Sequence, residues 1–198
     1  MKNKGLWITL GIIVVIALVL YGSFKGTYNQ MVTLDEQVQA SWSQVVTDYQ
    51  RRMDLIPNLV STVKGYADFE QETLTQVIQA RANATNVNLN VDNLDAATIG
   101  KLQQTQQALS SALSRLLVTV ERYPDLKANT NFLELQAQLE GTENRIANAR
   151  RKFNESTQTF NSFIRQFPQN IFANMFGFDK KPYFEADAGA EEAPKVEF

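Results

Sequence analysis

The most constraining feature of this sequence is a run of twenty uncharged residues, 5–24, whose most apolar part covers residues 6–21. At ~1.5 Å per residue, a helix of this length spans roughly 30 Å, the hydrocarbon thickness of a bilayer. The run therefore predicts a membrane-spanning helix, with aromatic rings near both ends at headgroup level. The residues expected to form this anchor are Leu6, Trp7, Ile12, Ile13, Val14, Val15, Ile16, Leu18, Val19, Leu20 and Tyr21.

Two other structures for this run are a cleaved signal peptide and a buried core helix. The run has no polar face, which disfavours a core helix in so small a domain. No small-residue cleavage pattern stands between Leu18 and Thr27, and there is no cysteine for a lipoprotein anchor. We therefore expect an uncleaved, single-pass signal-anchor. Lys2 and Lys4 precede the run against Lys25 after it, which predicts a cell-membrane protein with its main domain on the extracytoplasmic side.

Composition excludes several kinds of chemistry. The chain has no cysteine and no histidine, which removes thiol nucleophiles, the commonest general base and the usual zinc ligands. Its net charge of −2 argues against neutralisation of nucleic-acid phosphates. No glycine-rich phosphate loop or serine nucleophile motif is present. We expect no enzymatic activity, no cofactor or metal, no nucleic acid and no small-molecule substrate.

Beyond Lys25 the apolar residues recur with helical spacing almost everywhere. We expect four long helices, the first ending near residue 56 and the others covering about 58–84, 96–123 and 129–166, packed as an antiparallel up-and-down bundle. The first stripe is Met31, Leu34, Val38, Trp42, Val45, Tyr49, Met53 and Ile56, and the third is Ile99, Leu102, Gln106, Leu109, Leu113, Leu116, Val120 and Tyr123. The fourth carries Phe132, Leu139, Ile146, Phe153, Phe160 and Phe167 at heptad spacing, which is typical of a coiled coil.

Pro57 decides how the first two helices are connected. Proline lacks an amide hydrogen and disfavours helical geometry at the residue before it. We expect the chain to reverse at Pro57, because an unbroken helix would outrun its partners. The alternative is three long helices with the first bent at Pro57, since the apolar stripe continues in phase through Val60 and Val63.

The chain is expected to divide into a flank over residues 1–4, the membrane helix over 5–24, a helical domain over 25–178 and a tail over 179–198. The tail has six acidic residues against three lysines and is predicted to be disordered. Its apolar pair Tyr183 and Phe184 is a candidate short docking motif.

Several long motifs resemble the LemA family of bacterial membrane-anchored proteins. They are RRMDLIPNLV at residues 51–60, ERYPDLK at 121–127 and GTENRIA at 141–147. The resemblance covers nearly the whole chain. It implies an N-terminal membrane helix and an all-α domain, and it implies no activity, because the family has no established biochemical function.

Candidate interaction residues fall in two places. Arg51, Arg52 and Asp54 adjoin the expected turn and form either a recognition patch or helix-end hydrogen bonds. Phe172, Phe176 and Phe178 share one helical face, which either lies on a membrane or partner or closes the bundle. We therefore predict a non-catalytic, membrane-anchored scaffold that binds the bilayer and unknown proteins, self-association included. The alternative is a lipid-interacting helical module.

Overall fold

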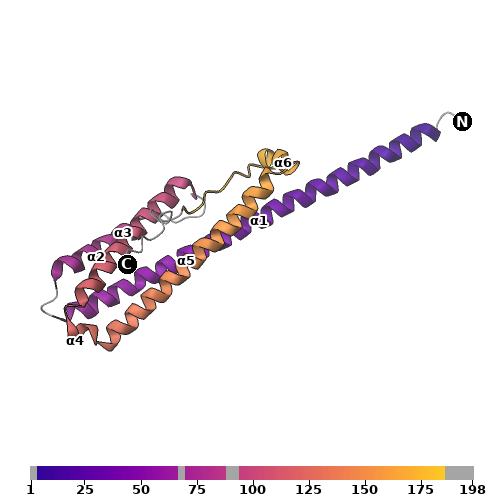
Figure 1. The fold of residues 1–198 in the computed structure, drawn as a ribbon. Helices are drawn as coiled ribbons and strands as arrows, with labels where there is room; N and C mark the ends of the chain where they lie inside the picture. Colours follow the sequence, from indigo (N-terminus) through magenta and orange to yellow (C-terminus); the bar gives the residue numbers. More distant parts are fainter. Residues whose placement is uncertain (1–3, 67–69, 88–93, 186–198) are drawn as a thin grey trace, which may run out of the picture. The chain divides into compact units, whose positions relative to one another are not determined.

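The computed structural model describes residues 4–66, 70–87 and 94–185, with side chains from Trp7 onward. The described residues form helices and no strand, so the predicted all-α class is confirmed (Figure 1). The helices are α1 (Lys4–Lys64), α2 (Gln71–Thr85), α3 (Ala96–Val120), α4 (Pro124–Lys127), α5 (Thr130–Arg165) and α6 (Gln169–Phe176).

The chain divides into two compact units, and α1 and α5 contribute to both. The first unit consists of Met1–Ala40 and Glu155–Lys181, and the second of Ser41–Asn154 and Pro182–Phe198. The predicted tail is split between them: residues 179–185 are placed against the helices instead of being disordered, while residues 186–198 lie outside the described residues.

The second unit is built around one apolar core. Successive long segments run in opposite directions, as predicted for an up-and-down arrangement (Figure 1). The core is contributed by α1 with Ile56, Leu59 and Val63, by α2 with Leu74 and Val77, by α3 with Leu109, Ala112 and Leu116, and by Leu126 and Phe132. Burial of these side chains supplies the main driving force for packing, at about 25 cal/mol per Å² of apolar surface.

The predicted reversal at Pro57 is wrong, because α1 continues through Pro57 and ends at Lys64. Val60 and Val63, which extend the stripe in phase, are both buried. The alternative is right that the first helix passes through Pro57, but α1 ends at Lys64 and α2 is a separate helix, so the three long helices of that alternative are not found among the described residues. The connection to α2 lies after Gly65, and the predicted second helix is shortened to Gln71–Thr85.

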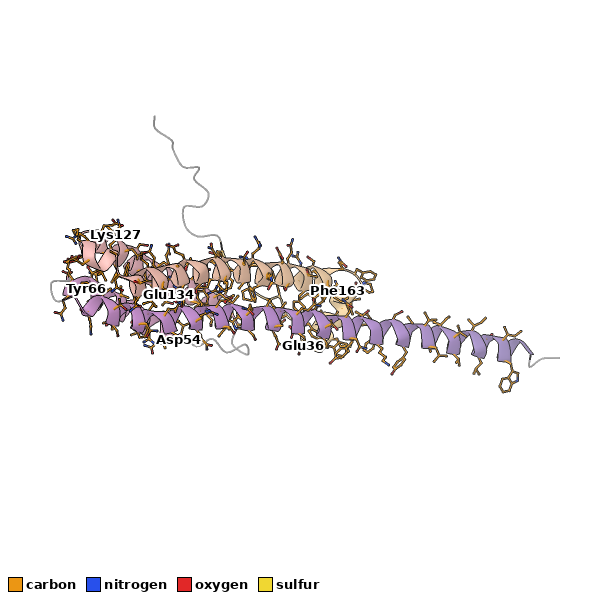
Figure 2. The ribbon with its side chains drawn as sticks, turned by 90° about the horizontal axis from the view of Figure 1, so that it is seen from below. Glu36, Asp54, Tyr66, Lys127, Glu134 and Phe163 are labelled. Carbon is orange, nitrogen blue, oxygen red and sulfur yellow. The ribbon has the colours of Figure 1, made fainter. Side chains whose placement is uncertain are left out.

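The end of α1 is tied to the start of α5 through one tyrosine. Asn129 donates its side-chain amide to the Tyr66 hydroxyl at 3.1 Å, and that hydroxyl donates to the Asp125 carbonyl at 3.4 Å. Figure 2 shows Tyr66 and Lys127 at the same end of the second unit. These bonds help to fix the α3–α5 connection, where Pro124 begins α4.

The predicted stripes correspond closely to the buried faces. All eight residues of the first stripe are buried, including Trp42, as expected of a core residue. Gln106 is buried with the apolar members of the third stripe from Ile99 to Val120, whereas Tyr123 at its end is only partly buried. In the heptad series Phe132, Ile146, Phe153 and Phe160 are buried, whereas Phe167 lies beyond the end of α5 and is exposed.

The first unit contains the predicted membrane segment. The stretch near the N-terminus of α1 is long and apolar enough to cross a membrane by length and composition, and none of its most apolar window is buried. The predicted anchor side chains from Trp7 to Tyr21 are exposed. Leu6 belongs to α1, but its side chain lies outside the described residues.

Candidate functional site

Arg52 does not lie on an exposed tip, so this part of the predicted patch is corrected. It stands in the interior of α1, with 3% of its surface exposed. Its guanidinium donates to Ser110 Oγ of α3 at 2.5 Å and pairs with Glu143 of α5 at 2.8 Å. Burial lowers the pKa of Arg52 below its ordinary value, and the nearby Glu143 carboxylate opposes that shift. Arg52 therefore joins three helices.

The two other residues of the predicted patch are exposed. Arg51 and Asp54 face solvent, and Asp54 lies on the outer side of α1 (Figure 2). They stand well inside α1, because the helix does not end at Pro57. The structure thus separates Arg52 from its two sequence neighbours.

A second ionic contact lies one turn before Arg52. Asp48 is buried and accepts a hydrogen bond from Gln44 Nε2 at 3.0 Å. Arg145 Nε approaches the other Asp48 oxygen at 3.8 Å. With Arg52 and Glu143, these groups form a polar layer that extends from the core to the surface of the bundle. Its two buried charges, Asp48 and Arg52, each have a charged partner, as buried charges require.

Beside this layer is an open cavity of about 240 Å³. Its walls include Arg52 and Tyr49 of α1, Gln106 and Ser110 of α3, and Arg150 of α5. Gln106 is only 4% exposed, and neither its amide nitrogen nor its amide oxygen has a hydrogen-bond partner in the described part of the chain. Buried amide groups normally have a hydrogen-bond partner, because a buried donor or acceptor without one lowers the stability of the fold by about 1–3 kcal/mol. Gln106 thus carries an unpartnered donor and acceptor behind the cavity wall.

The next feature is the segment of residues 182–185, which forms neither helix nor strand and which we call the strap. Phe184 of the strap is buried. Its ring stacks on Trp42 at a centroid distance of 5.9 Å and meets the Phe153 ring edge-on at 5.5 Å. The Arg150 guanidinium lies 5.0 Å above the same ring, a cation–π contact. Phe184 therefore anchors the strap in a pocket of the second unit.

Side-chain amides hold the strap by its backbone. Asn154 accepts from the Phe184 N–H at 2.9 Å and donates to the Phe184 carbonyl at 3.0 Å. Gln103 of α3 donates to the Glu185 carbonyl at 3.0 Å and accepts from the Glu185 N–H at 3.4 Å. Each amide thus satisfies both polar backbone groups of one residue. These backbone contacts do not depend on which side chains the strap carries.

Gln106 lies three residues after Gln103, on the next turn of α3, and both line the cavity. The amide of Gln103 holds a peptide backbone, and the amide of Gln106 has the same donor and acceptor without a partner. Gln103, Gln106 and Asn154 were not predicted as site residues from the sequence. The signal that could have found the site was Gln106 itself, a polar residue within an apolar stripe.

In the first unit, the candidate residues Phe172, Phe176 and Phe178 are brought together. Phe24 of α1 meets the rings of Phe172 at 5.2 Å and Phe176 at 5.4 Å. Tyr28, one turn later, meets Phe176 at 4.9 Å and Phe178 at 6.0 Å. We call these five residues the aromatic collar. Gly177, with φ of 72°, ends α6 in the left-handed conformation and turns Phe178 back toward Tyr28.

This chain has a long apolar helix that continues into packed α-helices, which is the arrangement of membrane-associated helical proteins. Residues 41–198 match the family model described as LemA family, so the chain belongs to the LemA family and the predicted resemblance is confirmed. This assignment and the exposed apolar stretch of α1 support a membrane location.

Three individual proteins are similar to this chain at sequence identities of 25–29%. The chain is 29% identical over 180 residues to the magnetosome protein MamQ of Magnetospirillum gryphiswaldense, covering 82% of this chain and 66% of the relative. It is 27% identical over 175 residues to magnetosome protein MamQ 2 of Paramagnetospirillum magneticum, covering 80% and 64%. It is 25% identical over 168 residues to protein LemA of Metamycoplasma hominis, covering 85% and 73%. The chain therefore spans less than two thirds of the length of the two MamQ proteins.

Proposed function

We propose that this protein is a non-catalytic scaffold, anchored in the cell membrane by residues 5–24, that holds extended segments of partner proteins. The helical domain lies on the extracytoplasmic side, as the charges around the apolar run favour. Membership of the LemA family supports the membrane location. Absence of cysteine and histidine from the whole sequence is in keeping with a role in contact instead of chemistry.

The observation that carries this proposal is the pair of Gln103 and Gln106 on α3. Gln103 holds the backbone of the strap, and Gln106, whose buried amide has no partner in the described part of the chain, lines the adjoining cavity. Recognition through backbone groups tolerates different side chains, which suits a scaffold that accepts extended segments.

A photo-crosslinking amino acid at position 107 of the full chain tests this function in cells. Gln107 is exposed and lines the cavity, whereas Gln104 is exposed on the same helix and does not line it. We expect a defined protein to crosslink from position 107 and not from position 104. Gln106→Leu should abolish that crosslink, because leucine has neither a donor nor an acceptor.

Two results would contradict the scaffold function. One is the same crosslinking pattern from positions 104 and 107. The other is a crosslink from position 107 that Gln106→Leu leaves unchanged, since the partner would then bind without the Gln106 amide. Thermal unfolding of Gln106→Leu controls for loss of the fold.

A module that acts on the lipid surface is the second candidate function. The observation that favours it is the contact of α6 with Phe24, the last residue of the uncharged run. Vesicle morphology tests it: the purified full chain should change the size or curvature of vesicles into which it is reconstituted. Vesicles of unchanged size and curvature would contradict the lipid-surface function and favour the scaffold function.

A further inference from the structure

The aromatic collar lies at a chemical boundary of α1. Phe24 is the last residue of the uncharged run, and Lys25 follows it directly. Phe172 and Phe176 of α6 both contact Phe24, and Phe176 also contacts Tyr28. Hence α6 is held at the level where α1 changes from apolar to polar. In a membrane-spanning helix, that level is the boundary between acyl chains and headgroups.

The composition of α6 suits that boundary. Residues 166–178 contain no charge, although Arg165 and Asp179 flank them directly. Insertion of this segment at the edge of the hydrocarbon would therefore bury no charged side chain. The segment combines asparagine and glutamine side chains with aromatic rings, which match an interface that is apolar on one side and wet on the other.

Three directions can be distinguished around α6. Ala173 is buried, and the rings of Phe172 and Phe176 contact α1. Ile171 and Met175 are 50% and 64% exposed. At 3.6 residues per turn, Asn170 and Asn174 are displaced from Ile171 and Met175 by about 100° around the helix axis. One side of α6 thus packs on α1, a second is apolar and exposed, and a third is polar and exposed.

The exposed apolar side continues the surface of the anchor. Phe167, just before α6, is 80% exposed and adds to Ile171 and Met175. The anchor side chains on α1 are exposed in the same unit and also require an apolar environment. Lipid alone would cover both the exposed apolar side of α6 and the anchor side chains of α1, including the aromatic collar between them. A second copy of the chain would cover α6 and still leave the anchor to lipid.

We propose that α6 is a second membrane contact, which lies in the bilayer interface with Ile171 and Met175 toward the acyl chains and Asn170 and Asn174 toward water. The collar sets its depth by fixing α6 to Phe24 and Tyr28. This inference rests on the membrane-spanning part of the proposed function and is independent of the peptide-holding cavity.

Single cysteines in the full chain test this arrangement, because the native sequence has no cysteine. Ile171→Cys, Met175→Cys and, as the matched control on the other exposed side, Asn170→Cys are labelled with an environment-sensitive fluorophore. The protein is reconstituted into phosphatidylcholine–phosphatidylglycerol vesicles that contain lipids with quenchers at shallow or deep acyl positions. Val14→Cys reports on the anchor.

We expect the labels at positions 171 and 175 to be quenched mainly by the shallow lipid, at a depth of about 5–10 Å below the headgroup boundary. The label at position 170 should remain accessible to an aqueous quencher, and the label at position 14 should be quenched by the deep lipid. Equal behaviour of positions 170, 171 and 175 would overturn the inference. So would burial of positions 171 and 175 that depends on protein concentration and not on quencher lipids, which would indicate a second copy.

The label at position 14 separates the two proposals. If it is not quenched by the deep lipid, the anchor itself is wrong. If it is quenched while positions 171 and 175 are not, the anchor stands and only the interfacial placement of α6 fails. Circular dichroism of each labelled variant controls for loss of helix.

Discussion

Arg81 of α2 donates its Nε–H to the backbone carbonyl of Met53 on α1, at a distance of 2.9 Å. In a regular helix that carbonyl would accept from the amide four residues later, at position 57. Position 57 is proline, which has no amide hydrogen. A side chain from a neighbouring helix thus supplies the missing donor, and α1 remains helical across Pro57 to Lys64.

The first prediction concerns this replacement. Arg81→Ala should lower the free energy of unfolding by about 1–3 kcal/mol, because the Met53 carbonyl loses its donor. In a Pro57→Ala background the cost should be smaller, since alanine at that position provides the backbone amide that proline lacks. Denaturant unfolding in detergent of the two single variants and the double variant gives the coupling energy. Strictly additive effects would show that the arginine acts elsewhere.

The second prediction concerns Phe184, the buried residue of the strap. Phe184→Ala should detach the strap, because it removes the ring that packs on Trp42 and Phe153 and lies beneath Arg150. The free energy that holds the strap in place should fall by at most about 3–5 kcal/mol, the range for replacing a buried phenylalanine by alanine. Hydrogen exchange of the strap amides measures it. Tyr183→Ala, at an exposed neighbour, should leave exchange at Phe184 and Glu185 nearly unchanged.

The third prediction concerns pH and the start of α3. Asp95 caps this helix by accepting from the Thr98 N–H, and this bond lowers the pKa of the Asp95 carboxyl. A lowered folded-state pKa stabilises the fold above the ordinary pKa of 3.8, and this stabilisation is lost as the pH falls through the folded value. Asp95→Asn retains an acceptor but should remove this part of the acid sensitivity. Melting temperatures of both proteins between about pH 2 and pH 6 test it.

The fourth prediction concerns membrane orientation. Lys2 and Lys4 against Lys25 favour a helical domain outside the cytoplasm. A cysteine in place of exposed Ser111 should react with a membrane-impermeant thiol reagent in intact spheroplasts, because the chain has no other thiol. A cysteine in place of Asn3 should react only after lysis. The reverse pattern would invert the topology.

Periodicity predicted the buried faces well, because the side chains on one face of a helix follow from residue spacing alone. Every residue of the stripe from Met31 to Ile56 is buried. The heptad series was accurate as far as Phe160 and failed at Phe167, because α5 ends at Arg165. The heptad spacing of apolar residues does not indicate the residue at which the helix ends.

The candidate site was less predictable. The sequence predicts Arg52 as a surface charge, since nothing in its neighbours shows that Ser110 and Glu143, distant in sequence, will enclose it. The strap was predicted as part of a disordered tail, because the composition of that tail is polar and acidic. Its order comes from contacts with Asn154 and Gln103, which are specific to the folded arrangement.

Composition and residue spacing are enough to predict that the chain is helical, that residues 5–24 are apolar enough to cross a membrane, and which apolar stripe is buried on most of the long helices. These properties depend on composition and spacing within one segment. The passage of α1 through Pro57 and the position of Gln106 at a cavity depend instead on how the helices pack. The physical reason is that the surroundings of a buried polar group come from other helices, distant in sequence: the donor for the Met53 carbonyl belongs to Arg81 of α2.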